Sequence, residues 1–169
     1  MRTRTLLALS SLLLLLGEAP ALADDAAALV GTWKLLSWEQ TRLSDESKKV
    51  FAEGQISGRL VYDPKGNMAV QYVFLDRTRF NGTSIQDGTS DEIKGAFTTY
   101  GAYFGRYSVD ESKKEVTHFV EANLFPNSSG STQKRSYELS GNRLTLKTPA
   151  LALRSKDATV YVLVWEKME

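Results

Sequence analysis

The chain has 169 residues, of which 42% are hydrophobic and 24% are charged, with a formal net charge of +1 and no cysteine. Because acidic and basic residues are balanced, the charge gives no indication of a nucleic-acid or acidic-membrane partner. The lack of cysteine excludes disulfides, thiolate nucleophiles and cysteine-ligated metals.

The first 23 residues have the pattern of a bacterial secretory signal peptide. Two arginines precede an apolar run from Leu6 to Leu16, and small residues lead to an Ala-Leu-Ala sequence that ends at Ala23. The run is too short to cross a bilayer. We therefore expect an exported protein, periplasmic or secreted, with residues 24–169 as a single domain. Cleavage removes two arginines and one glutamate, which leaves zero net charge and no segment for membrane insertion.

The rest of the chain is typical of short strands separated by turns. Eight strands are predicted, at 29–40, 57–62, 67–75, 103–109, 115–124, 133–139, 143–147 and 158–167. Pro64 and Gly66 fit a tight turn between the second and third of them. Eight strands at short spacing predict an all-β fold, an eight-stranded antiparallel up-and-down barrel. The polar stretches 40–55 and 76–88 are expected to form loops at its rims.

One short helix is predicted between the third and fourth strands. Thr89 and Glu92 have the spacing of a capping box. Apolar residues then recur at helical spacing, at Ile93, Phe97 and Tyr100. We expect this apolar stripe to pack on the mouth of the barrel.

Five sequence blocks carry a resemblance to a known family. They are "LVGTWKLLSWE" (29–39), "GRLVYDPKGNMAVQ" (58–71), "AYFGRYSVDE" (102–111), "VTHFVEANLFPN" (116–127) and "QKRSYELSGNRLTL" (133–146). In order and spacing they resemble the bacterial and fungal lipocalin-like domain proteins, over nearly all of 29–167. The resemblance implies a calycin-type barrel in which a tryptophan closes one end and a basic side chain from the last strand lies across it. These plug residues are Gly31, Trp33 and Lys167.

His118 is the only histidine, and the alternation of its strand places Val120, Ala122 and Leu124 on the same face. Arg135 on the next strand is expected to point into the same cavity. A largely apolar cavity with a few convergent polar groups is typical of a small-molecule site. The predicted ligand-binding residues are His118, Arg135, Tyr137, Tyr107, Tyr62 and Val120. An inward arginine needs a ligand anion, a glutamate or a tyrosine hydroxyl beside it; alternatively, Arg135 and His118 belong to a structural network.

The preferred hypothesis is a barrel that binds a small, mainly apolar ligand. An alternative is a barrel enzyme of isomerase or cyclase type, acting on a small hydrophobic metabolite, with His118 as the catalytic candidate for acid–base chemistry. This alternative follows from the resemblance, since some relatives, mostly fungal, are associated with such reactions on natural products. The sequence favours binding over catalysis, because one histidine without cysteine does not suit a metal site and no G-x-S-x-G motif is present.

A third possibility is a barrel with a filled interior that contacts a protein partner through an exposed apolar patch. No cofactor, metal or nucleic-acid partner is predicted. The sequence does not indicate the ligand or the oligomeric state.

Overall fold

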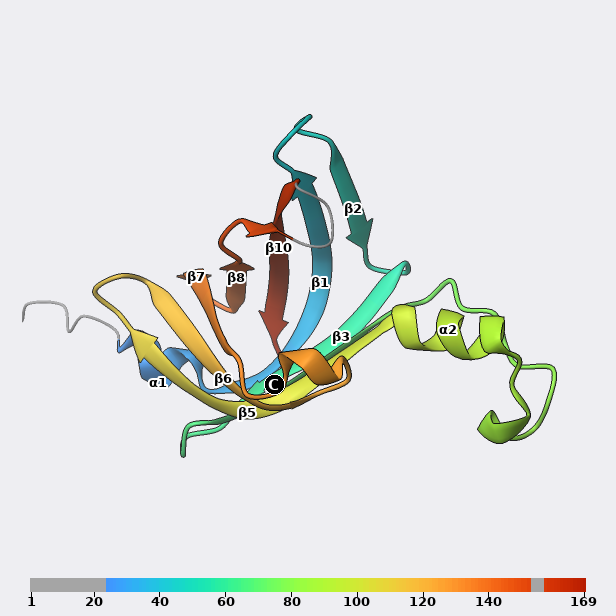
Figure 1. Ribbon diagram of the computed structural model, residues 1–169. Helices are drawn as coiled ribbons and strands as arrows, with labels where there is room; N and C mark the ends of the chain where they lie inside the picture. The colour runs from blue at the N-terminus through green and yellow to red at the C-terminus, as the bar shows by residue number, and fades with distance from the viewer. Residues whose placement is uncertain (1–23, 153–156) are drawn as a thin grey trace, which may run out of the picture.

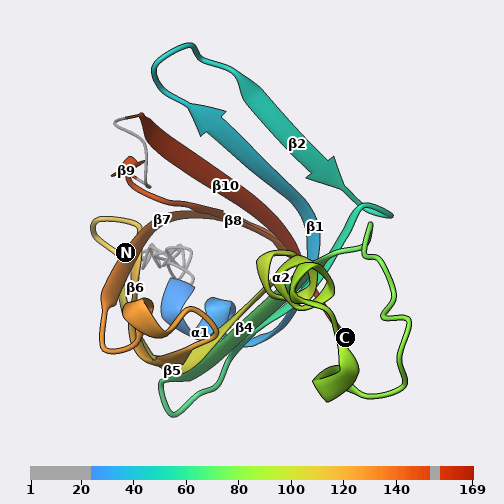
Figure 2. The same ribbon diagram turned by 45° about the vertical axis from the view of Figure 1, so that its right-hand side comes forward.

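Eight antiparallel strands close into a barrel in the computed structural model, which describes residues 24–152 and 157–169 (Figures 1 and 2). The expected signal peptide over residues 1–23 lies outside the described residues. The barrel strands are β1 (Gly31–Arg42), β3 (Ile56–Tyr62), β4 (Asn67–Phe74), β5 (Tyr100–Asp110), β6 (Glu115–Asn123), β7 (Thr132–Ser140), β8 (Arg143–Lys147) and β10 (Ala158–Lys167). Each pairs with the next, and β10 pairs with β1 to close the ring. The predicted up-and-down barrel is confirmed.

The alternation of side chains along each strand separates the interior from the surface. On β3, Ile56, Leu60 and Tyr62 are buried, while Ser57 and Val61 between them are exposed. This is the two-residue period of a strand with one buried face. The inward residues of neighbouring strands, together with Leu29 just before β1, form one core. This core includes Trp33, Leu35, Val116, Leu144 and Trp165.

Two further strands extend the barrel wall, β2 (Lys48–Ala52) and β9 (Leu151–Ala152). The expectation of a loop over 40–55 is wrong for β2. This strand pairs with Ser37–Thr41 of β1, whereas β3 pairs with the first residues of β1, Gly31–Lys34. Its charged residues hide the alternation that marks a strand. Besides this backbone pairing, an aromatic contact holds β2 to β1, since the Phe51 ring centroid lies 5.6 Å from that of Trp38.

The predicted helix is present as α2 (Ser90–Thr98), with both hydrogen bonds of the capping box between Thr89 and Glu92. The prediction that its apolar stripe packs on the barrel is wrong. Figure 1 shows α2 projecting away from the barrel, beyond the ends of β4 and β5, and Ile93 and Phe97 are 45% and 43% exposed. The reason lies in the sheet, because Tyr100 pairs with β4 as the first residue of β5 and does not continue the helical stripe.

A second, shorter helix that was not predicted, α1 (Asp25–Leu29), lies at the opposite end of the barrel. Asp24 caps it by accepting a hydrogen bond from the backbone of Ala27. The side chain of Leu29 is fully buried beside Trp33, whose Nε1 donates to the Leu29 carbonyl at 2.9 Å. This end of the barrel is therefore closed. No helix in the described part of the chain has the length and apolar character of a membrane span.

The residues of the expected plug lie together at this closed end. Nζ of Lys167 is 5.3 Å from the centroid of the Trp33 ring, within the range of a cation–π contact. It also donates to the carbonyl of Ala28 at 2.8 Å. A Cβ on Gly31 would lie 2.8 Å from Cε of Lys167, and its φ of +143° favours glycine. Lysine thus lies across the indole and also satisfies the C-terminal end of α1.

Candidate functional site

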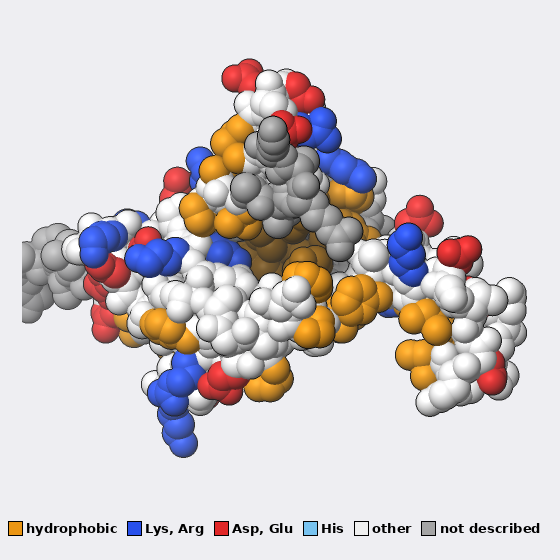
Figure 3. Space-filling model, viewed as in Figure 1, with side chains coloured by type: hydrophobic (Ala, Val, Ile, Leu, Met, Phe, Trp, Pro, Cys, Tyr) orange, Lys and Arg blue, Asp and Glu red, His pale blue; other side chains and the backbone are white. Residues whose placement is uncertain are grey.

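The open half of the barrel holds a cavity of about 310 Å³. Figure 3 shows the hollow, with hydrophobic side chains in its depth. Its walls are mainly apolar and aromatic, and include Trp38, Leu60, Val70, Tyr72, Leu146, Tyr161, Leu163 and Trp165. A volume near the lower end of the range for ligand pockets suits a small molecule.

Aromatic side chains gather where the cavity opens. The ring centroid of Trp38 lies 5.1 Å from that of Tyr161 and 5.4 Å from that of Phe74. Phe51 of β2 packs on Phe74 at 4.7 Å. The overhang of β1 and β2 therefore supplies an aromatic rim, and rings at these separations interact through their edges and faces.

His118 of β6 is 1% exposed and lies on the cavity wall. Both of its ring nitrogens contact tyrosine hydroxyls: Nε2 is 2.6 Å from the hydroxyl of Tyr62, and Nδ1 is 2.9 Å from that of Tyr103. Burial, with a smaller contribution from the charge of Arg135, lowers the pKa of His118 from 6.5 to about 3. The imidazole is therefore neutral near pH 7, with one nitrogen donating and the other accepting.

The surroundings of Tyr62 decide which nitrogen carries the proton. Tyr62 is buried behind His118, and its hydroxyl has no other hydrogen-bond partner within residues 24–152 and 157–169. If Nε2 carried the proton, the Tyr62 O–H would be left without an acceptor, which is costly in the interior. Tyr62 therefore donates to Nε2, and Nδ1–H donates to Tyr103. The O–H of Tyr103, which lines the cavity, is left to donate into it.

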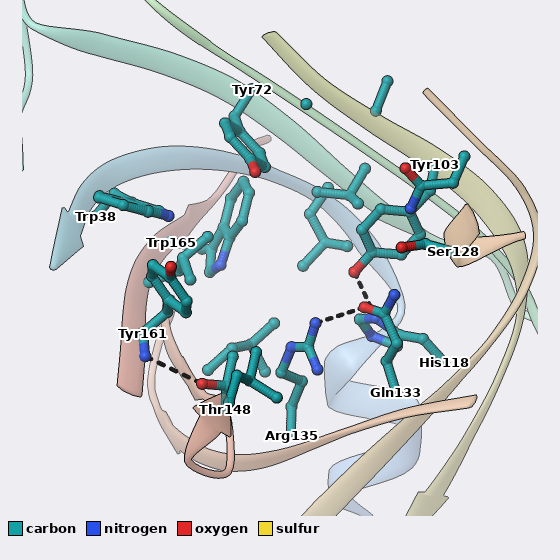
Figure 4. Close-up of a pocket in the computed structure, with 18 residues that line it drawn as sticks. Trp38, Tyr72, Tyr103, His118, Ser128, Gln133, Arg135, Thr148, Tyr161 and Trp165 are labelled. Carbon is teal, nitrogen blue, oxygen red and sulfur yellow. Dashed lines mark hydrogen bonds between the residues drawn. The ribbon is translucent and has the colours of Figure 1, made fainter. Parts of the chain in front are cut away.

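Arg135 of β7 is partly buried and points into the same cavity (Figure 4). Its Nη2 donates to Oε1 of Gln133 at 2.7 Å, and its Nη1 donates to the carbonyl of Lys134 at 2.9 Å. These two bonds hold the guanidinium in place. Its charge lowers the pKa of both His118 and Tyr103, although burial raises the pKa of Tyr103 more.

Trp165 of β10 lies across the cavity from Gln133 in Figure 4. The side chain is 1% exposed, and its Nε1 has no hydrogen-bond partner in the described part of the chain. Buried polar groups without partners are uncommon and call for an explanation. Nε1 is a donor only, so the group that matches it is an acceptor.

The sequence predictions for this site divide into two sets. His118 and Arg135 both line the cavity, as expected. Four other predicted residues, Tyr62, Tyr107, Tyr137 and Val120, are not among the lining residues. They lie in the filled half or behind the wall, because the cavity occupies only the open half of the barrel.

The hydroxyls of these tyrosines are engaged with the protein itself. Tyr137 donates to Oδ2 of Asp25 at 2.8 Å, and Tyr107 donates to the carbonyl of Asp63 at 2.9 Å. Tyr62 acts on the cavity only through His118. Tyr137 thus ties the inner surface of β7 to α1 at the closed end and does not reach the cavity.

A bulge on β6 changes which residues face inward. Val120 pairs with Gly105 and Ala122 pairs with Phe104, so Glu121 is an extra residue on β6. The expectation that Ala122 and Leu124 face the cavity is therefore wrong: Leu124 is exposed, and Asn123 lines the cavity. A Cβ on Gly105 would lie 2.0 Å from the carbonyl oxygen of Phe119, so only glycine fits opposite the bulge.

Several cavity residues were missed by the sequence analysis. They include Trp38, Tyr103, Gln133, Tyr161 and Trp165. The alternation of β10 could have found Tyr161 and Trp165, which share a face with Leu163, and that of β5 could have found Tyr103 from Tyr107. Simple alternation from Trp33 places Trp38 on the outer face, and it faces the cavity because the pairing of β1 with β10 shifts by one residue between Leu35 and Ser37.

Comparisons with known proteins agree with this geometry. The sequence model of a family described as a lipocalin-like domain matches residues 30–168. A protein of Aspergillus oryzae, named 4'-hydroxy-3'-methoxypropiophenone carrier protein, is 30% identical over 107 residues. The match covers 60% of this chain and 96% of the relative.

Proposed function

Because the chain belongs to the lipocalin-like domain family, we propose that it is a carrier that binds a small, mainly apolar ligand inside the barrel. The observation that carries this proposal is the cavity of about 310 Å³, with apolar and aromatic walls and a few polar groups that converge on it. A carrier needs an enclosed apolar site that opens at one end, and the barrel combines a closed end at Trp33 with an aromatic rim at Trp38.

The relative from Aspergillus oryzae supports a ligand with an aromatic ring. Its name states that it carries a substituted propiophenone, which is a small aryl ketone. In this chain Trp38, Tyr72 and Tyr161 line the cavity, and aromatic side chains favour stacked or edge-on contacts with a ligand ring. We propose an aromatic or similarly flat apolar body for the ligand.

The state of His118 favours carriage over catalysis. A general base works best when its pKa lies near the working pH, whereas the pKa of His118 is lowered to about 3. Both ring nitrogens are also held by tyrosine hydroxyls. The isomerase or cyclase alternative keeps one supporting observation, the chain of hydrogen bonds from Tyr62 through His118 to Tyr103, which could supply a proton to a bound substrate.

Export from the cell is part of the proposal. A signal peptide cleaved after Ala23 would leave Asp24 as the first residue, and Asp24 is the residue that caps α1. Cleavage at that bond would therefore preserve the helix that packs on Trp33.

The test is to identify what the protein binds. The processed protein is purified under native conditions, and co-purified compounds are identified by mass spectrometry. Binding of neutral 4'-methoxypropiophenone is then measured by calorimetry. The wild type is compared with two variants. Leu163→Trp fills the cavity, and Val164→Trp is the control, because Val164 is the next residue on β10 and does not line the cavity.

We expect Leu163→Trp to abolish binding and Val164→Trp to retain it, with both variants folded by circular dichroism. Equal binding by the wild type and Leu163→Trp would place the ligand outside the barrel and contradict the proposal. Conversion of a co-purified compound by the wild type would favour the enzyme alternative.

A further inference from the structure

We infer that the ligand carries an anionic oxygen, of carboxylate or phenolate type, which the guanidinium of Arg135 receives inside the cavity. This inference rests on the proposed ligand-binding function and adds the chemical class of the ligand's polar end. It follows from the charge balance of the cavity, from the way Arg135 is held, and from the hydrogen-bonding character of the groups around it.

Within residues 24–152 and 157–169, no carboxylate balances the charge of Arg135. Among the residues that line the cavity in the described chain there is no Asp or Glu. The ion pairs formed within residues 24–152 and 157–169 do not include Arg135, and the segment 153–156 contains no acidic residue. A positive charge that faces an apolar cavity without a counter-charge is costly, and an anion in the cavity would offset that cost.

The guanidinium is held in position and still has donors to offer. Gln133 and the carbonyl of Lys134 each accept one hydrogen bond from it. A guanidinium has five N–H donors, so three remain. Gln133 thus fixes the direction of Arg135 without neutralising it, and Figure 4 shows the group pointing toward the middle of the cavity. This is how a protein prepares a binding group in advance, because the arginine does not have to be ordered when the ligand arrives.

The neighbouring polar groups are matched to an acceptor. Nε1–H of Trp165 lacks a partner among the described residues, and the O–H of Tyr103 is free to donate once Nδ1–H of His118 donates to it. His118 itself is neutral and both its nitrogens are engaged. A ligand cation would be repelled by Arg135 and would find no carboxylate. An oxyanion would meet a positive charge and neutral donors.

The remaining wall is apolar, so the rest of the ligand must be apolar too. Leu146, Leu163 and Trp38 are among the apolar residues that line the cavity with Arg135. An amphiphilic molecule with its acidic end inward and its ring toward the aromatic rim satisfies both parts of the cavity. Binding would be stronger for the anion than for a neutral molecule of the same shape, because hydrogen bonds to charged groups are roughly twice as strong as neutral ones.

The experiment compares matched ligands on the processed, full barrel by calorimetry at a mildly alkaline pH, at which both acids are ionised. The first pair is 3-phenylpropanoic acid and its primary amide. The second pair is 4-nitrophenol, measured above its pKa, and 4-nitroanisole. The variants are Arg135→Met, which removes the charge, Arg135→Lys, which keeps it, and Arg143→Met as the control. Arg143 is an exposed arginine on β8 that does not line the cavity.

We expect the wild type and Arg143→Met to bind one or both anions on the order of 10-fold more tightly than the neutral partner. Arg135→Met should lose this preference and Arg135→Lys should keep part of it, while binding of the neutral partners is unchanged. A preference within the first pair alone identifies a carboxylate, and within the second alone a phenolate.

Equal affinity for anion and neutral partner in both pairs overturns the inference and leaves the proposed carrier function standing. The same holds for a preference that survives in a folded Arg135→Met. Failure of all four compounds and of 4'-methoxypropiophenone to bind would instead contradict the carrier function itself.

Discussion

The hydroxyl of Tyr62 lies 2.6 Å from Nε2 of His118, and this contact connects the core of the barrel with its cavity. Tyr62 faces the filled half and His118 faces the open half, so one hydrogen bond joins the two. Because Tyr62 donates to Nε2, the proton of His118 is on Nδ1, which donates it in a hydrogen bond to Tyr103, 2.9 Å away. The donor that the cavity offers to a ligand is thus set by a tyrosine that the ligand does not touch.

The pH dependence of stability should report the buried neutral state of His118. Its pKa is lowered from 6.5 to about 3 in the folded protein, chiefly by burial. Between these two values the unfolded chain binds the proton and the folded one does not. The contribution of His118 to the free energy of unfolding is therefore fully present above pH 6.5. It falls by about 1.4 kcal/mol per pH unit as the pH is lowered toward 3.

The measurement is the free energy of unfolding in urea at pH 7 and at pH 4.5, for the wild type and His118→Gln. The carboxylates titrate in both proteins, so their contribution cancels in the comparison. The wild type should lose more stability than the variant on acidification. An equal loss in the two proteins would show that His118 is not buried in its neutral form.

Replacement of the two tyrosines should show which of them the ligand contacts, since both bond to His118 and only Tyr103 lines the cavity. Tyr62→Phe leaves Nε2 of His118 without a partner in the core, and we expect it to lower the free energy of unfolding by about 1–3 kcal/mol. Tyr103→Phe removes the donor to the ligand and should weaken binding of a carbonyl compound by about 1 kcal/mol. Denaturant melts and calorimetry on both variants provide the check. The reverse assignment of effects would mean that Tyr62, and not Tyr103, faces the ligand.

His118→Gln tests whether the protein is a carrier or an enzyme. Glutamine keeps hydrogen-bonding capacity but cannot act as a base near neutral pH. For a carrier we expect a change in affinity of about 1 kcal/mol. For an isomerase or cyclase, turnover of the co-purified compound would fall by about two to four orders of magnitude while binding persists. Affinity and turnover are measured on the same compound, and a selective loss of turnover would replace carriage by catalysis.

Trp33→Ala should destabilise the barrel by roughly 3–5 kcal/mol, as expected for the loss of a large buried side chain. Trp33 is fully buried and bonded to α1 through the carbonyl of Leu29. Trp38→Ala is the matched control, because Trp38 is only partly buried at the open rim and should cost less. Urea melts decide the matter: a loss below about 1 kcal/mol for Trp33→Ala would show that the closed end does not depend on it.

The mature protein should begin at Asp24. The short apolar run and the Ala-Leu-Ala sequence that ends at Ala23 predict cleavage there. N-terminal sequencing of protein recovered from the periplasm or the medium gives the answer. Exported protein that still begins with Met1 would refute the signal-peptide assignment.

The strands were accessible from the sequence because alternation is a local signal. Arg143–Lys147 and Ala158–Lys167 have the predicted bounds, and His118 lies on the inner face as its strand pattern indicated. The two-residue period survives wherever one face of a strand is buried and the other is solvated.

The misplaced residues depend on long-range structure instead. The bulge at Glu121 arises where β6 meets Gly105 of β5, and nothing within β6 announces it. Likewise, Tyr137 has the alternation of a cavity residue, yet its hydroxyl bonds to Asp25, 112 positions away in the sequence. Strand pattern gives the face of the sheet; it does not give the depth along the barrel axis, which decides whether a side chain meets core or cavity.

The bulge at Glu121 also fixes the polarity of the rim. Residues beyond it on β6 face the way they do because one extra amino acid precedes them, so Asn123 is inside and Leu124 outside. Deleting Glu121 would restore strict alternation along β6 and leave Asn123 inside and Leu124 outside. The bulge thus fits one residue more than strict alternation allows between the inward Val120 and the inward Asn123, so the rim keeps its polarity whether or not position 121 is occupied.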